Sequence, residues 1–152
     1  MDPTKRFLAY YKAFEATYLD DDWTRLEPFF APDAVYRVTG SGAYDCTLRG
    51  RDAIFAGLRK FLDGFDRRCT RRLESLEPPS ATENTFSFRG AAIYTRGDSP
   101  PFRIALREII DFQEERIMRI TDVYDWGWES QLPADAEAWL QRYGADLTLS
   151  YV

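Results

Sequence analysis

The segment 116–126 places an acid where a strand pattern calls for an apolar side chain. Alternate side chains of a strand point to opposite faces. One face of this segment therefore holds Met118, Ile120, Asp122, Tyr124 and Trp126. A carboxylate in such surroundings costs free energy unless it is paired, protonated or used. Asp122 is the first catalytic candidate, since burial would raise its pKa and let it transfer protons near neutral pH. The alternative is a structural Asp held by a buried arginine or a tyrosine hydroxyl.

A second acid occupies the same kind of position on the preceding strand. Alternation along 102–112 makes Glu108 the one polar member of an apolar face. Two inward acids on adjacent strands push their pKa values apart, so that one is ionised and the other protonated. Glu108 and Asp122 would then form a usable acid–base pair. The alternatives are that Glu108 pairs with an arginine, or that a bulge turns it outward.

Aromatic side chains are more abundant than a small core needs. They make up 16% of the chain, which indicates an aromatic-lined cavity. A buried phenol can donate to a developing oxyanion or orient a substrate carbonyl, although each tyrosine is more often a core filler with a satisfied hydroxyl. The pocket residues that we expect on inward helix stripes and strand faces are Tyr11, Phe14, Tyr18, Tyr36, Val38, Phe61, Phe88, Tyr94, Leu106, Ile120, Tyr124 and Trp126.

Several kinds of chemistry are excluded by what the chain lacks. It contains no histidine, which rules out Ser–His and Cys–His nucleophile pairs and histidine-ligated metal sites within one chain. Neither a GxGxxG nor a Walker A motif is present. Cys46 and Cys69 do not have metal-like spacing, and we expect free thiols. We therefore expect no metal and no organic cofactor, with acid–base work carried by Asp, Glu, Tyr, Lys or Cys.

The charge balance argues against nucleic acid as a partner. The net charge is −5, and a duplex-binding surface needs clustered Lys and Arg. The densest basic run is Arg67, Arg68, Arg71 and Arg72, which we interpret as a solvated helix end. No segment is long and apolar enough to span a bilayer, and the N-terminal residues lack the apolar core of a signal peptide. We expect no membrane association and a cytoplasmic location.

The elements that must position these side chains follow from periodicity. Helical spacing of Phe7, Tyr11, Phe14 and Tyr18 predicts a first helix that begins at Asp2-Pro3. Helices come early and strands late, which indicates an α+β fold. The predicted elements are helices at 23–30, 50–65 and 133–144, strands at 34–39, 46–49, 71–76, 85–95, 102–112 and 116–126, and a tight turn at 113–115. No linker is visible, so we expect one domain over 1–152, with a core at about 5–128 and a C-terminal helical extension at 129–152.

Several motifs in combination resemble the NTF2-like superfamily, in its SnoaL-like and ketosteroid-isomerase-like branch. The matching pieces lie at 22–35, 48–54, 108–117 and 120–125. The resemblance implies a cone, in which a bent antiparallel sheet wraps around three helices from the N-terminal half and leaves a pocket open at one end. It also implies that Asp122 stands where polyketide cyclases and limonene-epoxide-hydrolase-like enzymes place an acid–base Asp.

The chain departs from the family's best-defined enzymes. Val38 stands nearest to the proton-abstracting Asp of the ketosteroid isomerases, and Phe14 stands near their oxyanion Tyr. The strand at 86–90 has no counterpart to the hydrolase Asp, and the histidines of scytalone-type dehydratases are absent. Because one fold hosts many activities, these departures leave the reaction open.

Two functions therefore stand side by side. The first is a cofactor-independent enzyme of the polyketide-cyclase, isomerase or hydratase type, which acts on an apolar ring-containing molecule. The second is a non-catalytic ligand-binding or accessory protein of the same fold. We also expect a homodimer through the outer sheet face, where Arg103, Arg107, Asp111, Arg119 and Asp125 could cross-pair, the alternative being an ordinary solvated face.

Overall fold

A computed structural model describes residues 1–125 and 134–152. Its helices and strands follow the predicted order closely. The elements are α1 (Pro3–Asp20), η1 (Trp23–Phe29), β1 (Phe30–Thr39), η2 (Gly42–Tyr44), β2 (Cys46–Arg49), α2 (Arg51–Gly64), η3 (Asp66–Arg68), β3 (Thr70–Ser75), β4 (Ser80–Ala81), β5 (Thr85–Thr95), β6 (Phe102–Gln113), β7 (Arg116–Tyr124) and α3 (Ala134–Tyr143).

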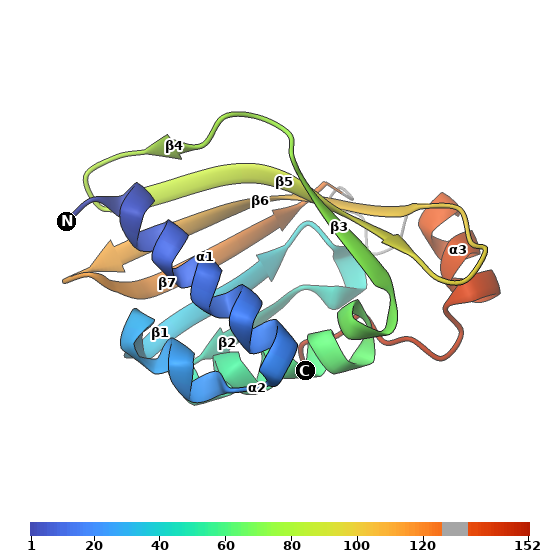
Figure 1. Ribbon diagram of the computed structural model, residues 1–152, viewed down its shortest axis with the longest axis horizontal. Helices are drawn as coiled ribbons and strands as arrows, with labels where there is room; N and C mark the ends of the chain where they lie inside the picture. The colour runs from blue at the N-terminus through green and yellow to red at the C-terminus, as the bar shows by residue number, and fades with distance from the viewer. Residues whose placement is uncertain (126–133) are drawn as a thin grey trace.

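The strands form one curved sheet, and the predicted α+β class is confirmed. The strand order is β2-β1-β7-β6-β5-β3, and the short β4 pairs with β5. Helix α1 crosses in front of the curved sheet, α2 lies along its lower side, and α3 lies at the far end of the β5–β6 hairpin (Figure 1). We expected an antiparallel sheet throughout, and this was wrong in one place. Strands β1 and β7 run parallel. These two strands are far apart in the chain, so no hairpin forces them to run in opposite directions.

Helix α1 begins as predicted, but its buried face is rotated by one residue. The Asp2 carboxylate accepts from the backbone N–H of Thr4 and Lys5. Phe7 and Tyr10 are buried, whereas Tyr11 is 39% exposed. The predicted stripe used steps of four and three residues from Phe7 through Tyr11. A step of three to Tyr10 fits the 3.6-residue period equally well, and packing against β5 and η1 decided between them.

The β6–β7 hairpin contains a bulge that changes one part of the predicted alternation. Asp111 pairs with Arg119 while Phe112 pairs with Ile117, so Met118 is an extra residue. An extra residue reverses which face the following side chains take. Ile117 is therefore in the core and Met118 is half-buried, the opposite of the prediction. Beyond the bulge, the predicted alternation holds for Ile120, Asp122 and Tyr124.

The turn of this hairpin is made by two glutamates. Glu114 has φ 49° and Glu115 has φ 67°, as in a type I′ turn. Two positive φ angles match the right-handed twist of the flanking strands, although glycine or asparagine is the usual choice there. The hairpin thus keeps its tight turn without glycine, which holds β6 and β7 in register next to the candidate acids.

The C-terminal segment packs back onto the body of the protein. Trp139 of α3 stacks on Phe102, with ring centroids 4.8 Å apart. After α3 the chain returns to α2, and Leu149 and Tyr151 are buried there. The predicted helix start at Pro133 lies outside the described residues. Within the described ranges, no helix combines the length and apolar character needed to cross a membrane.

Candidate active site

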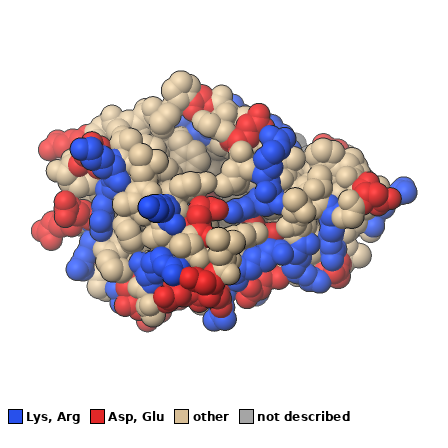
Figure 2. Space-filling model, viewed as in Figure 1, with Lys and Arg blue, Asp and Glu red and all other residues tan. Residues whose placement is uncertain are grey.

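A cavity of about 540 Å³ lies between the concave face of the sheet and helices α1 and α2. Its walls are mainly aromatic and aliphatic side chains. Three exposed apolar residues, Leu8, Tyr11 and Leu73, belong to this lining and mark an opening between α1 and β3. Figure 2 shows mainly uncharged surface around a hollow on this side of the molecule. The cavity therefore suits an apolar ligand that enters between α1 and β3.

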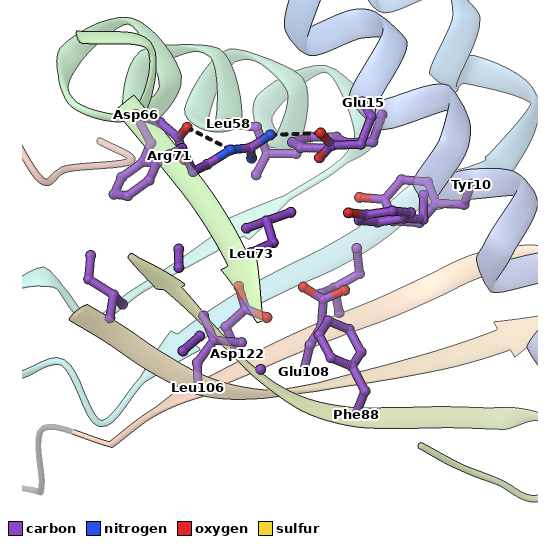
Figure 3. A pocket seen from close by; sticks show the side chains of 18 of the residues that line it. Tyr10, Glu15, Leu58, Asp66, Arg71, Leu73, Phe88, Leu106, Glu108 and Asp122 are labelled. Atoms are coloured by element: carbon purple, nitrogen blue, oxygen red, sulfur yellow. Dashed lines mark hydrogen bonds and ion pairs between the residues drawn. The ribbon is translucent and has the colours of Figure 1, made fainter. Parts of the chain in front are cut away.

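The two candidate acids face each other at the base of this cavity. Glu108 of β6 and Asp122 of β7 are direct partners in the sheet ladder, and both carboxyls point into the cavity (Figure 3). Asp122 is only 4% exposed. Its Oδ2 accepts a hydrogen bond from the Tyr36 hydroxyl at 2.5 Å, while its Oδ1 has no hydrogen-bond partner among the described residues. Asp122 thus combines burial in the cavity lining with one buried oxygen that accepts no hydrogen bond from the described residues.

Burial sets the protonation of this carboxyl pair. It raises the pKa of Asp122 to about 6, although the hydrogen bond from Tyr36 and the interaction with the adjacent Glu108 hold the pKa lower than burial alone would. Burial also raises the pKa of Glu108 well above its ordinary value, and the adjacent Asp122 charge raises it further. Glu108 has accessible surface because it borders the cavity, but protein surrounds it otherwise. When the pair shares one proton, Glu108 holds it and Asp122 is ionised, because the Asp122 charge raises the pKa of Glu108.

Tyr10 supplies a hydroxyl to the same space. It comes from the buried face of α1, and its hydroxyl points into the cavity (Figure 3). Burial raises the pKa of Tyr10, and the nearby Glu108 charge raises it further, so the phenol remains protonated. A protonated phenol can donate a hydrogen bond to a ligand oxygen. Tyr10 was not among the predicted pocket residues, because the predicted apolar stripe of this helix ran through Tyr11.

A second polar cluster lies nearer the opening. The Arg71 guanidinium contacts Asp66 (Nε to Oδ1, 3.5 Å) and Glu15 (Nη2 to Oε2, 2.7 Å), as Figure 3 shows. The Tyr94 hydroxyl donates to Asp66 Oδ2 at 2.9 Å. Burial raises the pKa of Asp66, while the Arg71 charge opposes that rise. This cluster joins α1, η3 and β3 beside the cavity. Its cation, Arg71, is already paired with two carboxylates.

The basic run at 67–72 is not simply a solvated helix end, so that interpretation was wrong in part. The helix stops at Gly64, and Arg71 lies on β3 with a side chain only 12% exposed. Arg67 pairs with Asp63 and Asp21. Arg68 and Arg72 remain exposed, with side chains 40% and 69% accessible. Periodicity could not find this because the change from helix to strand occurs inside the run.

Most of the predicted pocket residues line the cavity, and two do not. Those that line it are Tyr11, Phe14, Tyr36, Phe61, Phe88, Tyr94, Leu106, Ile120 and Tyr124, with the acids Glu108 and Asp122. Val38 is buried in the core beyond the cavity lining, two residues further along β1 than Tyr36. Tyr18 also lies outside the lining, because its ring packs 4.1 Å from the Arg71 guanidinium. Trp126 lies outside the described residues.

Tyr151 was not predicted as a pocket residue. It lines the cavity from the C-terminal tail, and its hydroxyl lies 2.8 Å from that of Tyr124. A lone aromatic residue in a tail carries no periodic signal, so the sequence offered no means of placing it. The same is true of Asp66, which follows the end of α2 and is buried only through tertiary contacts.

A curved sheet that closes around helices, with carboxyls at the base of the hollow, defines a class of cone-shaped pocket proteins. A family model for the SnoaL-like domain matches residues 7–120, and the chain belongs to this family within the NTF2-like superfamily. The predicted resemblance is thereby confirmed. No curated protein matches the sequence.

Solved structures show the same fold at low sequence identity. Bal32a, from a soil-derived mobile gene cassette, is 15% identical with a TM-score of 0.63, over 89% of this chain and 97% of that one. TerC, co-crystallised with polyporic acid, is 16% identical with a TM-score of 0.57, over 81% and 91%. A Catenulispora acidiphila protein with a ketosteroid-isomerase-like fold, in complex with trimethylamine, is 20% identical with a TM-score of 0.54, over 83% and 95%. At these identities the likeness establishes the fold alone.

Proposed function

We propose that this protein is a cofactor-independent enzyme that performs acid–base chemistry on an apolar, ring-containing small molecule. The reaction is of the polyketide-cyclase, isomerase or hydratase type. The observation that carries the proposal is the buried Asp122 carboxyl in the lining of an aromatic cavity, with the Glu108 carboxyl beside it. Asp122, with its pKa raised to about 6, is suited to proton transfer near neutral pH.

The chemistry follows from the protonation states. Ionised Asp122 accepts a proton from a carbon next to a carbonyl, and the C–H electron pair moves into the carbonyl to give an enolate. Protonated Glu108 or the Tyr10 hydroxyl donates a hydrogen bond to the enolate oxygen. Asp122 then returns the proton to the substrate at the same or another atom, or the enolate carbon attacks a second carbonyl, whose oxygen takes the π electron pair and then the proton held by Asp122. Return to another atom is isomerisation, and attack within the same molecule is cyclisation.

The shape and charge of the cavity support this class of substrate. Its volume of about 540 Å³ lies within the usual range for small-molecule sites, roughly 300–1,000 Å³. Among the described residues, the charged members of its lining are Arg71 and the acids Glu15, Asp66, Glu74, Glu108 and Asp122. The Arg71 charge is already paired with Asp66 and Glu15. A ligand without negative charge is therefore favoured, because an anion would face an acidic wall.

Proton exchange provides a direct test. Apolar ring ketones such as 2-tetralone are incubated with the protein in D₂O, and loss of the α-proton signal is followed by NMR. We expect exchange to be at least about 100-fold slower with Asp122→Asn than with wild type, the lower range for loss of a general base. Asp33→Asn, at an exposed carboxyl on β1, is the matched control and is expected to behave as wild type.

The non-catalytic reading makes the opposite prediction. Near the end of β1 the chain has Val38 rather than an acid, and Val38 does not line the cavity. This absence of an acid favours a ligand carrier over an isomerase of the ketosteroid type. If the ring ketones bind to wild type and Asp122→Asn alike, and neither protein accelerates exchange, the enzyme proposal is wrong. The cavity would then serve binding alone.

A further inference from the structure

The C-terminal tail, residues 144–152, closes part of the cavity wall. It returns from α3 to α2, and the C-terminus lies beside α2 (Figure 1). The backbone N–H of Thr148 donates to the carbonyl of Gly64 at 3.0 Å. Leu149 and Tyr151 are buried, and the Lys60 ammonium contacts the carbonyl of Val152. The tail is therefore anchored along its length.

Two glycines of α2 make room for this tail. A Cβ at Gly57 would lie 2.8 Å from the carbonyl oxygen of Tyr151, and one at Gly64 would lie 2.8 Å from that of Thr148. Glycine is less favourable than alanine in a helix, so its presence at both positions is explained by the close approach of the tail backbone. The tail's position is thus built into the helix that supports it.

Tyr151 carries the tail's contacts to the site. Its ring stacks on Phe61, with centroids 4.7 Å apart and planes at 5°. It also packs edge to face against the Tyr36 ring, with centroids 5.5 Å apart. Its hydroxyl lies 2.8 Å from the Tyr124 hydroxyl. Tyr36 is the residue whose hydroxyl binds Asp122 Oδ2. Tyr151 therefore touches the tyrosine that orients the proposed base, and does so from the C-terminal tail.

We infer that Tyr151 is a positioning residue: supplied by the C-terminal tail, it holds Tyr36 in the orientation that keeps the Tyr36 hydroxyl on Asp122. The inference rests on the proposed role of Asp122, because positioning matters for the reaction only if that carboxyl moves protons. The groups that face Asp122 from the elements around it are Tyr10 of α1, Tyr36 of β1, Cys46 of β2, Glu108 of β6, Tyr124 of β7 and Tyr151 itself.

The test measures the titration of the Asp122 carboxyl by NMR. The protein is labelled with ¹³C at the aspartate carboxyls, and the Asp122 resonance is assigned as the one that is missing in Asp122→Asn. Tyr36→Phe removes the hydrogen bond to Asp122 and is expected to raise the Asp122 pKa. Tyr151→Leu removes the ring that packs against Tyr36, and we expect a shift in the same direction, by about half a unit or more. Val152→Ala, at the exposed tail end, is the control and should leave the titration unchanged. An unchanged titration in Tyr151→Leu overturns the inference.

A second measurement uses the wild-type protein and does not depend on the folding of a variant. With tyrosine labelled at ¹³Cζ, the Tyr151 resonance should move with the same midpoint as Asp122, and that movement should disappear in Asp122→Asn. A Tyr151 resonance that stays flat through the Asp122 titration also overturns the inference. Neither measurement involves turnover, so failure of the proton-exchange assay and failure of this inference are separate results.

Discussion

Asp122 has a free-energy cost at neutral pH that follows from its burial. Its pKa is raised from 3.8 to about 6, so the folded protein binds this proton more tightly than the unfolded chain does. The stabilising contribution is complete below the ordinary pKa and is lost as the pH rises through about 6. Glu108 acts in the same direction, because burial raises its pKa as well. Keeping Asp122 ionised in the cavity therefore lowers stability, as is common where activity needs a destabilised group.

Replacing this carboxyl should stabilise the protein at neutral pH. We expect Asp122→Asn to raise the free energy of unfolding at pH 8 by roughly 1–3 kcal/mol, because an amide has no charge to desolvate. The gain should vanish at pH 4, where Asp122 is protonated in the folded protein. Urea unfolding at both pH values measures it, with Asp33→Asn as the exposed control. A loss of stability for Asp122→Asn that is equal at both pH values would contradict the assigned burial and pKa.

At the scale of elements, the approach of the tail to α2 explains a glycine that helix propensity disfavours. A Cβ at Gly64 would meet the backbone carbonyl of Thr148, which cannot rotate away as a side chain would. The backbone hydrogen bond from Thr148 to Gly64 must then lengthen or break. The junction of α2 and the tail is therefore sensitive to a single added methyl group.

Gly64→Ala should destabilise the protein, although alanine is the better helix former. We expect a loss of about 1–3 kcal/mol from overpacking, together with faster hydrogen exchange at the Thr148 amide. Urea unfolding and exchange measured by NMR test the two effects. Ala56→Gly, at an exposed position of the same helix, measures the propensity contribution alone. A gain of stability in Gly64→Ala would mean that the tail does not pack there.

At the scale of the whole molecule, the outer sheet face carries charges that are partly paired within the chain. Arg107 pairs with Glu77, Asp125 pairs with Arg89, and Asp111 accepts from Thr85 at 3.0 Å. Arg103 and Arg119 are exposed on the same strands. Three of the five residues that we expected to pair across a two-fold axis thus already have partners within the chain. The homodimer stays a prediction, and Arg103 and Arg119 are the residues that remain exposed for pairing.

Light scattering at micromolar concentration tests the dimer. We expect a mass of twice 17.7 kDa for wild type. Arg119→Glu should weaken the association, because an arginine that pairs with an acid of the other copy would be replaced by a like charge. Lys12→Glu, on the exposed side of α1, should not. A 17.7 kDa species as the sole component of wild type would remove the prediction.

The sequence by itself determined the features that depend on neighbours a few residues away. Two-residue and 3.6-residue periods located most of the helices and strands and the apolar faces that contain Glu108 and Asp122, and combined motifs identified the family. The tertiary structure alone decided the contacts between distant segments: the Met118 bulge, the choice of Tyr10 over Tyr11, the burial of Arg71 between Asp66 and Glu15, and the entry of Tyr151 into the cavity. These depend on which surfaces meet once the sheet has curved, and no local pattern records that.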